Sequence, residues 1–494
     1  MARPSVNGPG GRSTGNGPTL ETADMQGLVA RAYGQLPFAH YLLCEVTDAA
    51  AARAWLASVA PGVSTAARRD EGCGLVLAFT HAGLAALGLD DESLATFPLP
   101  LQEGMVTPHR SRILGDTGAS DPTHWRWGGP KKPAIHILVA IFAPDEAELE
   151  RELGERRAAF EGALAEVAPP IEGILQSGIE HFGFADGLSQ PILKGWPRRT
   201  ASVRPPAPPP PVKWEEVNPG EVVLGYPDNY DKPAQGPTVA GRGRAAAALP
   251  PAPWAPGRRH LGQNGTFLVF RQLAQDVGAF RRFVDAASAA SAGRGLALSP
   301  EKVGAKMVGR WPSGASLVVY PDADPGEAGT NDFGYNEQDQ AGFKCPVGAH
   351  VRRSNPRDSS AESPEKSLIS SKNHRVLRRG RPYGLSMVDP PNTTSGEEED
   401  AERGLLFLCL NSDFERQFEF VQHTWLDNGF FAGLCGEVDP LVGPQPEGGG
   451  GFTVADVPVR RRLTGVPQFV TTVGGAYFFL PGIRALEYLA KHAT

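Results

Sequence analysis

Apolar residues along the first half of the chain fall into short continuous runs and longer stretches at helical spacing. The runs at 33–46, 74–80 and 134–142 predict strands. The stretches at 49–60 and 145–167 predict helices, because their apolar residues recur every three or four positions. The resulting order of strand, helix, strand, strand and helix is typical of a ferredoxin-like α+β unit.

The second half of the chain repeats this order. Apolar runs at 265–273 and 404–411 predict buried strands, and the stretches that follow them, 276–292 and 413–429, predict helices. The order of predicted elements repeats, whereas the amino-acid sequence does not. We therefore expect an α+β protein built from two related domains that face one another.

The expected domain boundaries follow composition. Gly, Ser, Asn and Pro dominate the first residues, so 1–25 is expected to be a disordered leader. Proline and small residues dominate 201–260, which predicts a linker or surface loop, because proline donates no backbone hydrogen bond. The two domains are then expected at 26–200 and 261–494.

Composition excludes some classes of partner. The chain has 494 residues, of which 41% are hydrophobic and 21% charged, as in ordinary globular proteins. Its net charge of -7 gives no basic footprint for a polyanion, so we expect no nucleic-acid partner and no membrane surface as a partner.

The five cysteines are odd in number, far apart and never in a CxxC pair, so we expect reduced thiols. The first thirty residues contain no apolar run typical of a secretion signal, and no apolar run elsewhere is long enough to span a membrane. The expected location is cytoplasmic.

The segment GIEHFGFADGLSQP at 178–191 is the first candidate for chemistry. It places Asp186 in an aromatic setting with Gly183 and Gly187 on either side, which predicts a tight turn that carries one acid. Aspartate before glycine most often caps a turn through its own backbone, so this segment alone favours a structural role.

The segment FKCPVGAHVRRSNPRD at 343–358 places His350 after two small residues, which would let a flat ligand approach the backbone. A lone histidine is more often an ordinary core or surface residue. Arg352, Arg353 and Arg357 change that balance, because guanidinium groups disfavour protonation of a nearby imidazole and can bind anionic groups. The alternative is a solvated strand edge.

The segment SKNHRVLRRGRPYG at 371–384 contains four arginines. In a strand, alternation sends Val376 and Arg378 to one face and Leu377 and Arg379 to the other. One of the two central arginines should therefore point inward. A buried guanidinium needs an anion, which makes the inward arginine a candidate site residue.

These three segments, GFADG, GAHVRRSNPRD and VLRRGRPYG, stand in the order found in dye-decolorizing (DyP-type) haem peroxidases, and the chain resembles the longer-chain branch of that family. LGQNGTFLVFRQL at 261–273 and GLLFLCLNSDFERQFEFVQ at 404–422 are also similar to it. The resemblance covers residues 26 to 490. It implies two ferredoxin-like domains with antiparallel sheets, the second holding most of one haem b.

The resemblance also implies roles for single residues. His350 matches the axial ligand of the haem iron, while Asp186 and Arg378 match the catalytic pair on the peroxide side. Gly183 and Gly187 match the family's GxxDG motif, and Arg353 is expected to bind the cofactor. The acid that bonds to the axial imidazole fits Asp439 best, with Asp413 as the alternative.

The implied activity is reduction of hydrogen peroxide and one-electron oxidation of bulky phenols or dyes through an oxyferryl intermediate. Two other functions stay open at this point. A haem carrier would need His350 but not Asp186 and Arg378. A phosphate-binding protein could use the arginine clusters and GRGR at 241–244, although no predicted strand precedes that glycine pattern.

Overall fold

The computed structural model describes residues 19–67, 72–175, 178–196, 213–292, 298–385 and 401–492. Most of the expected leader, 1–18, and the PPAPPPP run at 205–211 lie outside these residues. None of the helices in the described ranges is long and apolar enough to cross a membrane.

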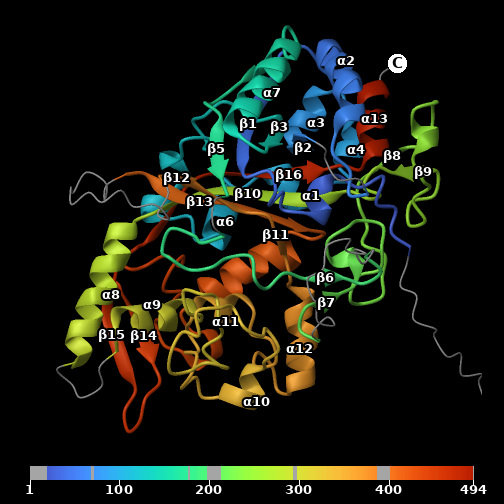
Figure 1. The fold of residues 1–494 in the computed structure, drawn as a ribbon. Helices are drawn as coiled ribbons and strands as arrows, with labels where there is room; N and C mark the ends of the chain where they lie inside the picture. The colour runs from blue at the N-terminus through green and yellow to red at the C-terminus, as the bar shows by residue number, and fades with distance from the viewer. Residues whose placement is uncertain are drawn as a thin grey trace, which may run out of the picture.

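One sheet of ten antiparallel strands runs through the middle of the molecule (Figure 1). Its order is β11-β13-β10-β16-β2-β3-β1-β4, with β12 beside β13 and β5 beside β1. The strands are β1 (Phe38–Val46), β2 (Gly74–Phe79), β3 (Ile137–Ala143), β4 (Leu164–Glu166), β5 (Ile171–Ile174), β10 (Thr266–Gln275), β11 (Leu377–Arg378), β12 (Arg381–Gly384), β13 (Arg403–Asn411) and β16 (Val470–Leu480).

Each half of this sheet has the ferredoxin-like arrangement. In the first half, α2 (Ala49–Val59) links β1 to β2 and α7 (Glu146–Ala159) links β3 to β4, which gives the spatial order β4-β1-β3-β2. In the second half, α8 (Val277–Ala292) follows β10, a helical segment at 415–426 follows β13, and the order is β16-β10-β13-β11. The expected fold class is confirmed.

The two halves join edge to edge within the sheet. Phe79 at the end of β2 pairs with Phe479 near the end of β16. The helices α2 and α7 cover the first half, together with α13 (Ile483–Lys491) from the other end of the chain (Figure 1). The last helix of the chain therefore packs on the first half and not on the second.

The remaining elements of the described ranges surround the sheet. The other helices are α1 (Gly27–Ala30), α3 (His81–Ala86), α4 (Asp91–Leu94), α5 (Leu99–Glu103), α6 (Pro108–Ile113), α9 (Pro300–Val308), α10 (Tyr335–Asp339), α11 (His350–Ser354) and α12 (Pro364–Asn373). Three two-stranded sheets pair β6 (Ile192–Leu193) with β7 (Glu216–Val217), β8 (Thr238–Ala240) with β9 (Arg258–His260), and β14 (Gly450–Val454) with β15 (Arg461–Val466).

Both faces of the large sheet are buried, which explains why its strands read as continuous apolar runs. Along β1, Leu42 and Cys44 enter the core under the helices of the first half, whereas Tyr41 and Leu43 enter the core on the opposite face. A third core lies around α9 and the first part of α8, where Phe280 and Val284 are buried.

The structure differs from the sequence prediction in two segments, one at α7 and one near the start of the chain. The predicted helix at 145–167 ends at Ala159, because Gly162 adopts a left-handed conformation (φ 73°) and Leu164–Glu166 pairs with β1 instead. Residues 19–25 of the expected leader are packed, with Met25 buried and Asp24 bonded to Arg484. Leu20 and Met25 are the large apolar residues of this segment, and two of them five positions apart give no periodic signal.

The described part of the expected linker, 213–260, is also packed and contains β7, β8 and β9. Val222, Val223 and Leu224 are fully buried there. The prolines of the segment do not prevent this, because none of them lies within β7, β8 or β9, where a backbone N–H is needed for pairing. The boundaries expected at 200 and 260 remain predictions.

Candidate active site

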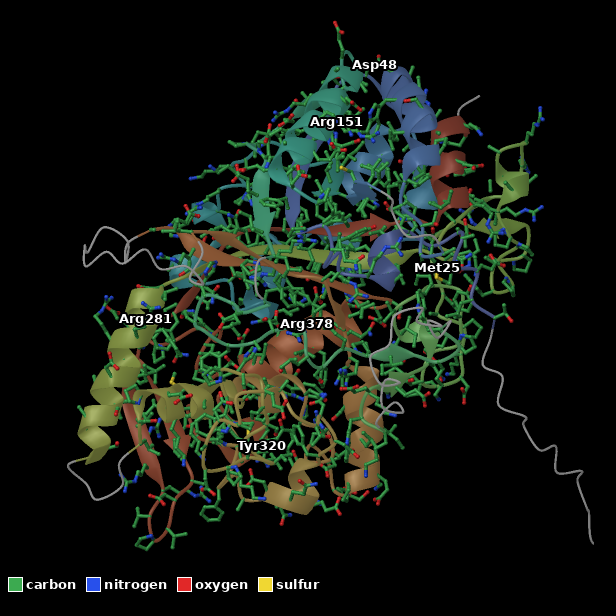
Figure 2. All side chains as sticks on the ribbon, viewed as in Figure 1. Met25, Asp48, Arg151, Arg281, Tyr320 and Arg378 are labelled. Atoms are coloured by element: carbon green, nitrogen blue, oxygen red, sulfur yellow. The ribbon has the colours of Figure 1, made fainter. Side chains whose placement is uncertain are left out.

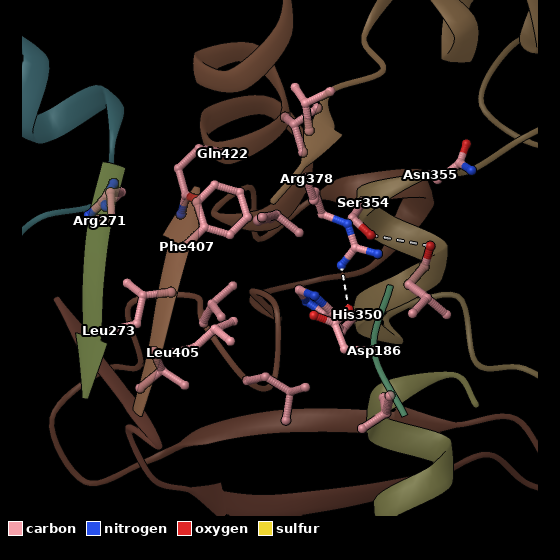
Figure 3. Close-up of a pocket in the computed structure, with 18 of the residues that line it drawn as sticks. Asp186, Arg271, Leu273, His350, Ser354, Asn355, Arg378, Leu405, Phe407 and Gln422 are labelled. Atoms are coloured by element: carbon pink, nitrogen blue, oxygen red, sulfur yellow. Dashed lines mark hydrogen bonds and ion pairs between the residues drawn. The ribbon is translucent and has the colours of Figure 1, made fainter. Parts of the chain in front are cut away.

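A cavity of about 300 Å³ lies on the second half of the sheet, within the usual size range of ligand pockets. Arg271 and Leu273 of β10 face it on one side, and Leu405 and Phe407 of β13 lie beside them (Figure 3). Alternation explains this set, because residues two apart on a strand share a face. The helix α11, the turn at 180–189 and the helical segment at 415–426 complete the wall.

His350 is the first residue of α11 and points into the cavity (Figure 3). Its Nδ1 donates a hydrogen bond of 2.9 Å to Oδ2 of Asp439, whose other oxygen accepts the backbone N–H groups of Leu441 and Val442. Asp439 is fully buried, whereas 29% of the His350 side chain is exposed. The bond fixes the tautomer and leaves Nε2 as the free ring nitrogen.

The two partners change each other's acidity. Burial alone would lower the pKa of His350, but the Asp439 carboxylate outweighs burial and raises that pKa above its ordinary value. Burial alone would raise the pKa of Asp439, but His350 holds it below its ordinary value. Asp439 is therefore a carboxylate that accepts the imidazole N–H. Asp413 lies elsewhere, with 46% of its side chain exposed and Arg416 as its ion-pair partner.

Asp186 lies in the tight turn that the sequence predicts. Gly183 (φ 97°) and Gly187 (φ 80°) both adopt the left-handed conformation that glycine tolerates. Oδ1 of Asp186 accepts hydrogen bonds from the backbone N–H of Gly187 at 2.6 Å and from Nη1 of Arg378 at 2.9 Å. Partial desolvation in the cavity favours a higher pKa, but Arg378 and the Gly187 N–H bring the pKa of Asp186 below its ordinary value.

The two central arginines of the third segment diverge as strand alternation requires. Arg378 lies on the cavity side of β11, near the centre of the molecule (Figures 2 and 3). Arg379 points the other way and donates to the backbone carbonyls of Leu28 and Val29. The structure thus brings His350, Asp186 and Arg378 to one cavity from three segments that are far apart in the sequence.

Comparison with known proteins identifies the family. No family model matches the chain. It is 33% identical over 390 residues to the multifunctional dye peroxidase DyP2 of Amycolatopsis sp., a match that covers 75% of this chain and 74% of that protein. A dye-decolorizing peroxidase of Mycena epipterygia is 30% identical over 458 residues, 84% of this chain and 75% of the relative. The chain belongs to the dye-decolorizing peroxidase family.

A solved structure agrees with this assignment. A dye-decolorizing peroxidase in complex with 2,6-dimethoxyphenol superposes with a TM-score of 0.72 at 26% identity, and the match covers 95% of this chain and 100% of that one. The cofactor of a dye-decolorizing peroxidase is haem b, and its enzyme class is that of oxidoreductases that use peroxide.

The charged residues around the cavity of this peroxidase suit haem. Arg310, Arg357 and Arg375 line it, and within the described residues their guanidinium groups bond to carbonyl oxygens and not to carboxylates. Nη1 of Arg375 is buried without a hydrogen-bond partner among the described residues. Burial lowers the pKa of Arg357 to about 10 and that of Arg375 to about 9. Such a rim suits the carboxylates of haem b.

Arg353 lies outside this rim, although the sequence suggested it as a cofactor ligand. Its guanidinium is fully buried and donates to backbone carbonyls, including those of Gly348, Trp425 and Glu437. Its positive charge helps to hold the pKa of Asp439 low. Arg353 therefore acts on Asp439, the partner of His350, through its charge and does not line the cavity.

Arg310 and Glu180 are among the site residues that sequence reasoning missed. Arg310 stands alone in VGRWPSG, and no motif or cluster marks it. Glu180 lies in the same segment as Asp186 and also lines the cavity. The signal for Glu180 was that it lies close to Asp186 in the same segment. The sequence does not show which backbone N–H groups its carboxylate will bind.

Proposed function

We propose that this peroxidase reduces hydrogen peroxide at haem b, with Asp186 as the proton acceptor and Arg378 as its charged partner, and oxidises phenols and dyes by single electrons. The observation that carries the proposal is the Asp186–Arg378 pair, which lies in the same cavity as His350. The relative solved with 2,6-dimethoxyphenol supports a phenol as the reductant.

Asp186 is suited to accept a proton from hydrogen peroxide. The carboxylate is held in its charged form by Arg378, which lowers its pKa, so it is available as a base at neutral and mildly acidic pH. About a third of its side chain, 37%, is exposed, so peroxide can reach it. The same carboxyl group can then return the proton to the leaving oxygen, which avoids releasing hydroxide.

Arg378 supplies fixed positive charge where negative charge develops as the O–O bond breaks. One guanidinium nitrogen is committed to Asp186, and the side chain keeps 35% of its surface exposed. Its backbone N–H donates to Oε1 of Gln190, which ties β11 to the segment after Asp186. The pair is therefore held together at the side chains and at the backbone.

His350 is proposed to bind the haem iron through Nε2, with Arg310, Arg357 and Arg375 at the carboxylates of the cofactor. Bound haem supplies the iron at which peroxide is reduced and to which the electrons of the reductant pass. Asp439 accepts the hydrogen bond from Nδ1 of His350 and so increases the basicity of the ligand. Leu273, Leu405 and Phe407 provide the apolar wall that restricts water in the cavity.

A spectrum combined with turnover tests this proposal. Purified holoprotein is expected to show a Soret band and to oxidise 2,6-dimethoxyphenol only when peroxide is added. A Soret band without turnover would favour a haem carrier instead. No Soret band after haem is supplied would overturn the haem assignment and leave the arginines free for another anion.

The cytoplasmic location is also proposed, with reduced thiols as its support. Cys44, Cys345 and Cys409 are buried and free in the structure. Fractionation of the producing cells tests it. Activity recovered mainly in the medium would contradict a cytoplasmic location.

A further inference from the structure

The turn that carries Asp186 contains a second acid, which accepts backbone hydrogen bonds from the turn itself. Oε2 of Glu180 accepts the backbone N–H of Phe182 at 2.9 Å, and Oε1 accepts that of Phe184 at 3.0 Å. The Glu180 backbone N–H donates in return to the carbonyl of Phe184 at 2.9 Å. One carboxylate thus fixes the two residues on either side of Gly183.

Glu180 also connects this turn to the sheet. Nε2 of Gln275, the last residue of β10, donates to Oε2 of Glu180 at 2.8 Å. Gln275 stands on the same face of β10 as Arg271 and Leu273, and all three line the cavity. The end of the turn is held separately, because the Asp186 N–H donates to the carbonyl of Gly178 at 2.9 Å.

We propose that Glu180 and Gln275 are positioning residues that hold Asp186 at Arg378. The inference rests on the proposed role of Asp186 as the proton acceptor. Neither Glu180 nor Gln275 needs to touch peroxide. They act by fixing the backbone on which Asp186 is carried, because the distance from Asp186 to its reaction partner depends on the conformation between Gly183 and Gly187.

Energetics explain why a carboxylate stands here. Burial raises the pKa of Glu180 to about 7, and the negative charge of Asp186 adds to the effect, so the site is costly for a charged carboxylate. Only a carboxylate offers two equivalent oxygens to two backbone N–H groups and a third donor. Glutamine at this position would replace one acceptor by an NH₂ group and leave Phe182 or Phe184 without its bond.

The first test compares Glu180→Gln and Gln275→Leu with Glu221→Gln. Glu221 is a matched control, because it is fully buried and accepts the backbone N–H of Asn229, yet it does not line the cavity. We expect both site variants to retain haem while the second-order rate with peroxide falls about 10- to 100-fold, the cost of a misplaced catalytic group. A loss no larger than that of Glu221→Gln would overturn the proposal.

A double-mutant cycle separates positioning from general stability. If Glu180 acts through Asp186, adding Glu180→Gln to Asp186→Asn should change the peroxide rate by less than about threefold. Multiplication of the two single effects would mean that Glu180 works independently of Asp186, against the proposal. An unaffected Asp186→Asn variant would instead refute the proposed function on which the inference rests.

Amide hydrogen exchange of the haem-loaded protein gives a readout that does not depend on turnover. The N–H groups of Phe182 and Phe184 should exchange at least about tenfold faster in Glu180→Gln than in the wild type, and at the wild-type rate in Glu221→Gln. Unchanged protection at both amides would show that Glu180 does not brace the turn. This measurement tests whether Glu180 holds the turn, even if the chemistry assigned to Asp186 is wrong.

Discussion

Two acid–base pairs of equal length and different exposure meet the cavity, one through His350 and the other through both of its members. His350 and Asp439 are joined at 2.9 Å, as are Arg378 and Asp186. Asp439 is fully buried, whereas Asp186 is 37% exposed. Equal bonds in unequal surroundings indicate different roles, because a proton can be exchanged with a ligand only by a group that the ligand can reach.

In the closed pair, His350 and Asp439, the carboxylate is held in one position. Asp439 accepts one N–H from His350 and two from the backbone, so a shift of the carboxylate would break three bonds together. The open pair, Arg378 and Asp186, has fewer fixed contacts on its acid, and its exposed atoms face the cavity. The predictions below test this contrast, beginning with the residue expected to matter most.

Replacement of His350 by alanine should abolish or greatly weaken haem binding, because the axial bond is lost. Haem titration followed by the Soret band measures the effect. His374→Ala is the matched control, since His374 also lines the cavity but stacks on Phe420 and bonds to the Arg416 carbonyl. Full haem occupancy in His350→Ala with an unchanged spectrum would place the ligand at another histidine.

Replacement of Asp186 by asparagine should keep haem and slow the peroxide reaction by about 10² to 10⁴, the usual contribution of a general base. Asparagine has nearly the same size but cannot accept the proton. Stopped-flow mixing against pH is the measurement.

The sign of the pH dependence follows from Arg378, which lowers the pKa of Asp186. The wild-type rate should hold through neutral and mildly acidic pH and decline only below the ordinary carboxyl range near ~3.9, where the base becomes protonated. The asparagine variant should lack that decline. Two profiles that overlie would remove Asp186 from the mechanism.

Arg378→Leu should slow the peroxide reaction by about 10² to 10³, as expected when one charged donor is removed from a developing anion. Arg379→Leu should retain most of the rate, because that side chain binds the Leu28 and Val29 carbonyls on the other face of the strand. The same stopped-flow experiment compares them. Equal losses would contradict the assignment of Arg378 alone to the open pair.

Asp439→Asn should have the smallest effect of the four, a loss of about 10- to 100-fold in haem affinity or activity, as is typical when the partner of a metal ligand is changed. Asp413→Asn is the control and should leave both unchanged, because Asp413 pairs with Arg416 on the surface. Equal behaviour of the two variants would mean that the closed pair has no function beyond packing.

The fold was predictable from the sequence as far as local patterns reach. Continuous apolar runs and helical spacing located β10, β13, α2 and α8, and the repeated order implied two ferredoxin-like halves. The pairing of β2 with β16 was not predictable, because Phe79 and Phe479 are ordinary apolar residues at strand ends. The early end of α7 depended on pairing of β4 with β1, a strand far earlier in the chain.

By itself the sequence determined the three motifs that carry Asp186, His350 and Arg378, and strand alternation required Arg378 and Arg379 to diverge, because these are properties of neighbouring residues. Only the tertiary structure decided between Asp439 and Asp413, moved Arg353 behind the site, and brought Arg310 and Glu180 to the cavity. The physical reason is that burial and hydrogen-bond partners depend on segments far apart in the chain, whose distances no local pattern fixes.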